Sequence, residues 1–329
     1  DTEREVVQIH WGGGTPTYLS PDQIENLGQH LHERFTVTED AEISIEADPR
    51  GLTEAHLAAA RRVGFNRLSM GVQDFHPEVQ RAINRVQPER LTRQAVRWAR
   101  DLGFTGINLD LVYGLPHQTT ERFAQTVDKV IDIGPDRIAL FSYAHVPSMK
   151  KHQRLIDEAA LPDPTTKLAI FKLALETLVD AGGYRFIGMD HFARPDDELA
   201  RAQDAGRLHR NFQGYSTRAG ADIVAFGISG ISQLEGLYAQ NVKDLRAYYE
   251  RIDAGRGTVY RGVRLTPEDR LRRRVIMELM CHFRLDKRTV ERWAEATLGT
   301  PVAFDAHFAE ALEQLRPDRK STRLNSSHK

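Results

Sequence analysis

Short β-rich apolar runs alternate with longer amphipathic stretches from residue 6 to about residue 145. This alternation is typical of repeated βα units, which build a parallel sheet covered by helices. Five consecutive units fit a complete or partial barrel better than a sandwich, and a chain of 329 residues also has room for a second, smaller domain. The strands that we expect are Val6–Trp11, Glu42–Glu46, Arg67–Val72, Gly106–Leu111 and Arg137–Phe141.

The segments between these strands carry helical spacing. Ser20 and Pro21 form a helix-start signal, with serine as the N-cap and proline in the first turn. Apolar residues that recur every three to four positions predict a helix in each gap. These residues are Ile24, Leu27 and Leu31; Leu57, Ala60 and Val63; Ala95, Trp98, Ala99 and Leu102; and Phe123, Val127, Val130 and Ile131.

The rest of the chain changes character after residue 146. A helix is expected from about Thr165 to Ala181, and mixed polar, aromatic and glycine residues follow without clear periodicity, as in lids and binding walls. Ala221–Ile231 returns to strand-like alternation, and the composition turns helical and charged from Thr266 onward. We therefore expect a partial barrel with a substrate or lid segment at 1–235, a small truncated helical domain at 236–316, and a disordered or non-native tail at 317–329.

The charge balance narrows the class of partner. The chain has 45 Lys and Arg against 46 Asp and Glu, a net charge of −1, so it lacks the basic excess of a nucleic-acid binder. No apolar stretch approaches the roughly 20 residues that span a bilayer. We expect a soluble, cytoplasmic monomer that acts on a small molecule, with no nucleic-acid or membrane partner.

The only cysteine is Cys281, which rules out a disulfide framework and leaves no cysteine cluster for a metal or iron–sulfur site. A lone cysteine of this kind is most often a buried packing residue. The 13 histidines show no HExxH or HxxxH arrangement, and no Gly-x-Ser-x-Gly nucleophile motif occurs. The chain itself therefore offers no metal ligands and no hydrolase nucleophile.

Three glycines, Gly12 to Gly14, directly follow the first strand. Glycines let backbone N–H groups approach a ligand, and the C-terminal ends of parallel strands are where such sheets bind ligands. A tight strand-to-helix turn is an equally good interpretation. In the next strand, Glu46 needs a cationic partner if it is buried, either a ligand ammonium group or an arginine such as Arg67.

Gln73 ends the third strand and Asp110 lies near the end of the fourth. At equivalent rims of neighbouring strands, an amide and a carboxylate could hydrogen-bond a ribose diol. Taken singly, each is more often a supporting residue or a helix cap.

Six segments together resemble one family. The segments are WGGGTP, SIEADPR, RLSMGVQDF followed by Asn84-Arg85, DLVYGLPHQT, FIGMDHFARPDDEL and HRNFQGYST. Over roughly residues 6 to 290 the chain resembles the oxygen-independent coproporphyrinogen III dehydrogenase (oxidase) family of the radical S-adenosylmethionine (radical SAM) superfamily. The last two segments separate this family from haem-carrying relatives.

The resemblance implies a partial (β/α)6 barrel, a [4Fe–4S] cluster held by a CxxxCxxC loop, and two SAM molecules. It implies anaerobic oxidative decarboxylation of two propionates of coproporphyrinogen III to vinyl groups by a 5′-deoxyadenosyl radical, which gives protoporphyrinogen IX. It also implies an electron donor, of unknown identity, as a partner. The first SAM would contact Gly13, Glu46 and Ile231. The second would contact Gly14, Thr15, Gln73, Arg85, Asp110 and Ala144. Phe212 and Gln213 would lie near the substrate.

The same resemblance places the first barrel strand, the cluster cysteines and the catalytic residues upstream of Asp1. We therefore expect a fragment that cannot hold the cluster and is inactive by itself. Two alternatives remain open at this point. One is a haem-binding or haem-transferring radical SAM relative, and the other is a partial barrel enzyme that binds a phosphorylated ligand through the glycine loop.

Overall fold

The computed structural model describes residues 4–299 and 301–315, and the chain divides into two compact units after Arg207. This division lies before the predicted boundary at residue 235. Residues 208–235 belong to the second unit because they bond within it; for example, the Tyr215 hydroxyl donates to the Met280 carbonyl at 2.9 Å, and Ile223 bridges to Gln233. The predicted tail at 317–329 lies outside the described residues.

The first unit is built on a seven-stranded sheet with the order β1-β2-β3-β4-β5-β7-β6. The first five strands are parallel, and β7 and β6 extend the sheet in antiparallel fashion. All five predicted strands are present; four are longer by one or two residues, whereas β2 has 12 residues and begins six positions before the predicted Glu42. Their bounds are β1 Glu5–Trp11, β2 Thr36–Ala47, β3 Arg67–Gln73, β4 Gly106–Tyr113, β5 Arg137–Ser142, β6 Arg185–Gly188 and β7 His191–Ala193.

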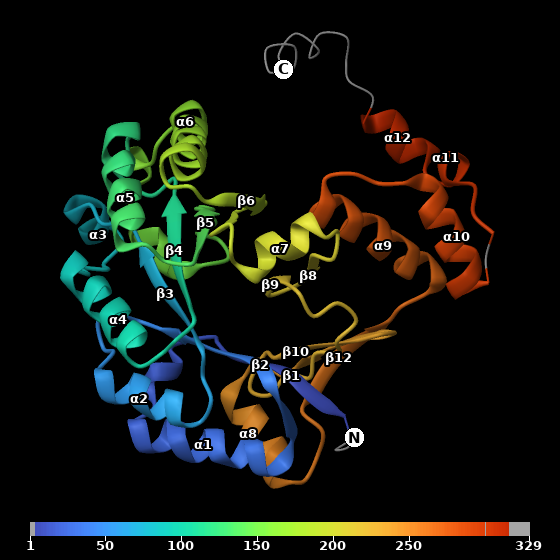
Figure 1. Cartoon of the computed structure of the whole chain (residues 1–329), viewed down its shortest axis with the longest axis horizontal. Helices are drawn as coiled ribbons and strands as arrows, with labels where there is room; N and C mark the ends of the chain where they lie inside the picture. The colour runs from blue at the N-terminus through green and yellow to red at the C-terminus, as the bar shows by residue number, and fades with distance from the viewer. Residues whose placement is uncertain (1–3, 300, 316–329) are drawn as a thin grey trace. The chain divides into compact units, whose positions relative to one another are not determined.

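Helices connect the strands and lie along one side of the curled sheet (Figure 1). They are α1 Pro21–Arg34, α2 Glu54–Arg62, α3 Pro77–Ala82, α4 Glu89–Asp101, α5 Thr120–Ile133, and α6 Pro164–Glu176 with a π-helical turn at Thr177–Ala181. One more helix, α7 Glu198–Asp204, follows β7 at the end of the unit. The Ser20 hydroxyl accepts from the Gln23 N–H and the Gln23 side chain accepts from the Ser20 N–H, which completes the predicted cap of α1. The arrangement confirms the predicted α/β partial barrel.

The two faces of the sheet have different chemistry. Outward side chains such as Ile45, Leu68 and Leu109 are buried with helix residues in one apolar core. Most inward side chains near the middle of the strands are polar or small. Register partners across parallel strands share a face, so these side chains line up in rows. One such row runs Gly71, Asp110, Ala139 and His191 across β3, β4, β5 and β7. The apolar core therefore stabilises the sheet from its outer face, and the polar inner face can bind a ligand.

An ion-pair network closes the inner face at the N-terminal ends of the strands. Arg67 begins β3 and bonds Glu42 and Glu198, each at 2.7 Å. Arg137 begins β5 and bonds Asp197 and Glu198, each at 2.9 Å. A half-buried guanidinium group is stable in its charged form only if it has several partners. The network supplies them. This end of the sheet is built for stability rather than for ligand binding.

The second unit mixes sheet and helix. Its strands are the hairpin β8 His209–Asn211 and β9 Gly214–Ser216, and the antiparallel sheet β10 Ile231–Leu234, β11 Leu237–Asn241 and β12 Val259–Arg264. Its helices are α8 Leu245–Asp253, α9 Pro267–His282, α10 Lys287–Leu298, α11 Phe304–His307 and α12 Ala309–Leu315. The sequence predicts a small helical domain at 236–316. The described residues of that segment contain strands as well as helices.

The predicted strand at Ala221–Ile231 is wrong. Only Ile223 makes a bridge there, and the regular strand begins at Ile231. The cause is local, because Gly227 and Ser229 adopt positive φ values of 89° and 56°. The Asn241 side-chain amide then donates to the Ala225 and Gly227 carbonyls, which would otherwise face a neighbouring strand.

Candidate functional site

The glycine loop after β1 is a strand-to-helix connection that also binds a carboxylate. Gly13 and Gly14 have φ values of 78° and 62°, which favour glycine, and the Gly13 N–H donates to Glu46 Oε2 at 3.0 Å. Thr15 begins a short 3₁₀ turn, Pro16–Tyr18, and accepts the Tyr18 N–H through its carbonyl at 2.9 Å. The loop therefore brings its backbone donors to the C-terminal end of β2.

Glu46 does not pair with Arg67, so that alternative is wrong; Arg67 lies at the opposite end of its strand, in the ion-pair network. The partner of Glu46 is His10, with Nε2 3.4 Å from Oε1. The His10 contact, helped by the Gly13 N–H, lowers the pKa of Glu46 despite partial burial. Glu46 is thus ionised at neutral pH, and with 44% of its side chain exposed it remains open to a ligand cation.

Gln73 has an unusual backbone. Its φ is 68°, and the N–H of Asp74 donates to the carbonyl of Val72 at 2.9 Å, which makes a tight γ-turn centred on Gln73. The pairing of β3 with β4 shifts register between Gly71 and Gln73. A non-glycine residue with this φ is strained, and such strain clusters at functional sites. The irregularity turns the Gln73 side chain back over β3.

Gly71 provides the space into which that side chain turns. A Cβ built on Gly71 would lie 2.7 Å from Gln73 Nε2 and 3.3 Å from a terminal nitrogen of Arg85. Gly71 is also the register partner of Asp110. An amide, a guanidinium and a carboxylate therefore share one spot on the inner face, as the sequence predicted for Gln73 and Asp110.

Arg85 reaches this spot from the loop after α3. It donates to the Gly71 carbonyl at 2.8 Å and pairs with Asp48 at 3.2 Å. Burial lowers the pKa of Arg85, and its Nε is buried without an acceptor in the described part of the chain. An unsatisfied buried donor is costly, so this guanidinium is held in place at a cost in stability. With 20% of its side chain exposed, Arg85 can still offer N–H groups to a ligand anion.

Asp110 is the most perturbed acid of the site. Burial, and then the negative charges of Glu46 and Asp190, raise its pKa to about 6. The Asn108 amide donates to Oδ1 at 2.7 Å and opposes this shift. A half-buried carboxylate with a strongly shifted pKa, on a polar inner face, is a typical binding-site group.

A buried network supports the turn at Gln73. The Asp74 carboxylate accepts from the Gln118 amide at 2.6 Å and from the Thr126 hydroxyl at 2.7 Å. The Gln118 oxygen accepts the Gly114 and Leu115 N–H groups, so it joins the ends of β3 and β4. The motifs QDF and GLPHQT signalled this edge, but nothing local in them showed that Asp74 and Gln118 meet.

A second pair that sequence reasoning missed is Asp190 and His191. Asp190 lies in the turn between β6 and β7, and its carboxylate contacts His191 Nδ1 at 2.5 Å. Both residues influence the pKa of Asp110, and His191 lies in its register row. Their motif, MDHFARPDDEL, contributes to the family resemblance, but nothing in it shows that these two residues lie near Asp110.

Four predicted residues lie on other elements. Ala144 follows β5, and its carbonyl accepts from the Gln153 amide at 2.9 Å. Ile231, Phe212 and Gln213 belong to the second unit: Ile231 pairs with Gln240 at the start of β10, and Phe212 and Gln213 form the tip of the β8–β9 hairpin. Their roles stay predictions.

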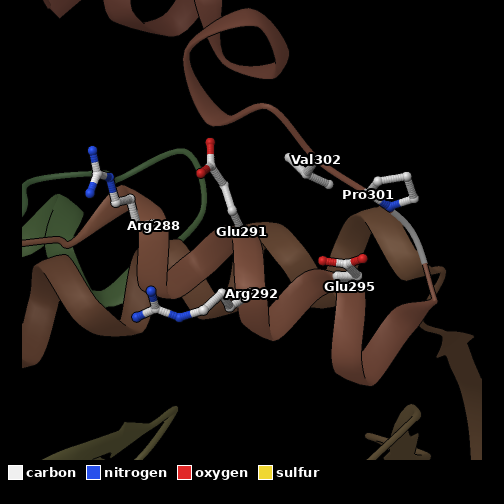
Figure 2. A pocket seen from close by; sticks show the side chains of 6 residues that line it. All are labelled: Arg288, Glu291, Arg292, Glu295, Pro301 and Val302. Atoms are coloured by element: carbon white, nitrogen blue, oxygen red, sulfur yellow. The ribbon is translucent and has the colours of Figure 1, made fainter.

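The described residues hold no group of three histidine, cysteine or acidic side chains that could bind a metal. Cys281 is buried, and burial raises the pKa of its thiol to about 11, so it is a packing residue. Within residues 4–299 and 301–315, no helix is long and apolar enough to cross a membrane. A shallow pocket on α10 has mixed charges and no connection to the predicted chemistry; it is lined by Arg288, Glu291, Arg292, Glu295, Pro301 and Val302 (Figure 2).

Comparison with known proteins adds the family context. The Radical SAM superfamily model matches residues 1–130. The oxygen-independent coproporphyrinogen III oxidase of Salmonella typhimurium is 49% identical over 328 residues, which cover 99% of this chain and 70% of that protein. That of Helicobacter pylori J99 is 44% identical over 330 residues, which cover all of this chain and 71% of that protein.

A solved structure agrees. The coproporphyrinogen III oxidase of Escherichia coli, a radical SAM enzyme, matches with a TM-score of 0.91 and 49% identity over 95% of this chain and 71% of the other. The chain thus spans about 70% of the length of these relatives.

Proposed function

This chain belongs to the oxygen-independent coproporphyrinogen III oxidase family of radical SAM enzymes, and from this premise we propose that it binds SAM on the inner face of its partial barrel, at the C-terminal ends of the strands. The family makes it an enzyme of haem biosynthesis that acts on coproporphyrinogen III. The two alternatives, a haem carrier and a phosphate-binding barrel, do not match these relatives.

The convergence of Gln73, Arg85 and Asp110 over Gly71 is the observation that carries this proposal. SAM offers a ribose diol, a carboxylate and two cations. Asp110 and the Gln73 amide suit ribose hydroxyls, and the partly exposed guanidinium of Arg85 suits the methionyl carboxylate, since guanidinium matches planar anions. Glu46, held ionised beside the glycine loop, suits an ammonium group.

We assign these residues to two SAM molecules. Gly13 and Glu46 would contact the first, together with Ile231. Gly14, Thr15, Gln73, Arg85, Asp110 and Ala144 would contact the second. The ion-pair network occupies the inner face at the opposite, N-terminal ends of the strands.

When bound, SAM supplies the radical chemistry that converts propionates to vinyl groups. The protein's own part is to orient the ligand and to exclude water and stray hydrogen donors. The family's [4Fe–4S] cluster does not fit the residues present, because the sequence holds one cysteine and that thiol is buried.

Calorimetric titration of this chain with SAM tests the proposal. Saturable binding is expected, weakened about tenfold or more in Glu46→Gln and in Arg85→Gln. Glu54→Gln, at the exposed start of α2, is the control and should bind as wild type. A folded wild-type chain without saturable SAM binding would refute the assignment.

A further inference from the structure

Helix α9 of the second unit presents arginines to the rest of that unit. Arg270, Arg273 and Arg274 lie at i, i+3 and i+4 and therefore share one face. All three are half-buried, as is Arg210 on the neighbouring strand β8. Helix faces that pack against other elements are usually apolar, so four half-buried guanidinium groups need an explanation.

Their partners do not balance their charge. Arg274 pairs with Glu278, and Arg270 lies 3.8 Å from Glu235, whose side chain is 86% exposed. Arg210 and Arg273 instead lie over the rings of Tyr215 and Tyr238, each 5.7 Å from the ring centroid. In the described part of the chain neither of these two arginines has a carboxylate partner.

Unsatisfied donors and the lowered pKa of a histidine also indicate an excess of positive charge. The Nε atoms of Arg210, Arg270 and Arg274 are buried without an acceptor among the described residues. Burial, and then the charges of Arg273 and Arg274, lower the pKa of His209, which begins β8. Half-buried positive charge with unused donors is costly unless an anion binds there.

The adjacent hairpin adds an apolar contact surface. The Tyr215 hydroxyl donates to the Met280 carbonyl at 2.9 Å, which fixes the β8–β9 hairpin against the end of α9. At the tip of this hairpin, between Asn211 and Gly214, the ring of Phe212 is 46% exposed. A ligand that combines flat apolar rings with several carboxylates matches both features.

We propose that Arg210, Arg273 and Arg274 form a carboxylate-binding site for the propionate side chains of the tetrapyrrole substrate, with Phe212 contacting a pyrrole ring. This inference rests on the proposed function for the identity of the ligand. It assigns substrate recognition to the second unit and adds three residues to the predicted pair Phe212 and Gln213. The guanidinium forks would set the preference for a polycarboxylate over an uncharged tetrapyrrole.

The site can be tested by titrating the chain anaerobically with coproporphyrinogen III and measuring the heat of binding by calorimetry. We expect Arg273→Gln and Arg210→Gln to weaken binding about tenfold or more, and high salt to weaken wild-type binding. Arg272→Gln is the matched control, since Arg272 is on the same helix, is 63% exposed and pairs with Glu268. The three variants should bind SAM as wild type does.

The outcomes separate this inference from the SAM assignment. If Arg273→Gln and Arg272→Gln bind the porphyrinogen equally well, the arginine site is wrong. The same follows if the wild-type chain binds SAM but not coproporphyrinogen III. Should Arg210→Gln fail to fold, Arg273→Gln decides alone, because Arg273 has no side-chain hydrogen bond within the described residues. Absence of SAM binding in the wild type contradicts the proposed function instead.

Discussion

Gly71→Ala should separate ligand binding from stability. Gly71 is in extended backbone, so alanine fits its φ and ψ, and replacing a strand glycine gains roughly 0.5–1 kcal/mol. The new Cβ would lie 2.7 Å from Gln73 Nε2 and 3.3 Å from an Arg85 nitrogen, so both side chains must move by several tenths of an ångström. The free energy of unfolding should therefore change by less than about 1 kcal/mol, since the gain offsets the strain.

SAM binding should respond much more strongly. Misplacing a contact group by about 1 Å can cost as much as 100-fold, so we expect a loss of about tenfold to 100-fold in affinity. Calorimetry measures the affinity, and urea denaturation followed by circular dichroism measures stability. Gly51→Ala is the control, because a Cβ there meets nothing within 4 Å.

A double-mutant cycle makes the test decisive. Gln73→Ala removes the side chain that the new methyl group meets first, so adding Gly71→Ala to it should cost little more. Wild-type affinity in a folded Gly71→Ala protein would refute the reasoning. Equal losses in the single variant and in the Gln73→Ala background would mean that Gly71 acts by another route.

Three further outcomes follow from the same structure. Burial raises the pKa of Asp110 from 3.8 to about 6, so between these pH values the folded state holds more protons than the unfolded state. The contribution of Asp110 to stability is therefore lost as pH rises from 3.8 to about 6, and Asp110→Asn should be about 2–3 kcal/mol more stable than wild type at pH 8 but not at pH 4, measured by urea titration. Asp197→Ala removes one of the carboxylates that hold half-buried Arg137 but leaves Glu198 in place, and should cost about 1.5–3 kcal/mol, against less than about 1 for Asp204→Ala at an exposed pair, measured by the same titration. Thr126→Val keeps the side-chain shape but removes a donor to buried Asp74, and should cost about 1–3 kcal/mol by thermal denaturation.

The barrel could be predicted because its signals are local and repeated. Strands such as β3 and β4 read as alternating residues whose outward members are apolar, and the Ser20 cap depends on residues three positions apart. Those patterns follow from the geometry of single elements. The position of Gln73 and Asp110 at one edge of the sheet could also be predicted, because parallel strands bring their C-terminal ends together.

Contacts across strands could not be read from the sequence. The partner of Glu46 is His10, 36 positions earlier, and an arginine at the start of β3 was an equally plausible guess. Gly71 reads as an ordinary strand glycine, and only the structure shows that its missing side chain makes room for Gln73 and Arg85. The γ-turn at Gln73 likewise has no local signature, since a network around Asp74 supports it.

The segment MDHFARPDDEL shows why a motif alone does not locate a site. Asp190 and His191 lie at the ligand-binding edge, beside Asp110. Asp197 and Glu198 lie at the opposite end of the sheet, where they neutralise Arg67 and Arg137. The antiparallel strand β7 separates the two pairs and runs from one end of the sheet toward the other. One half of the motif therefore serves binding and the other half serves stability, and a substitution in the stability half would reduce activity without touching a ligand.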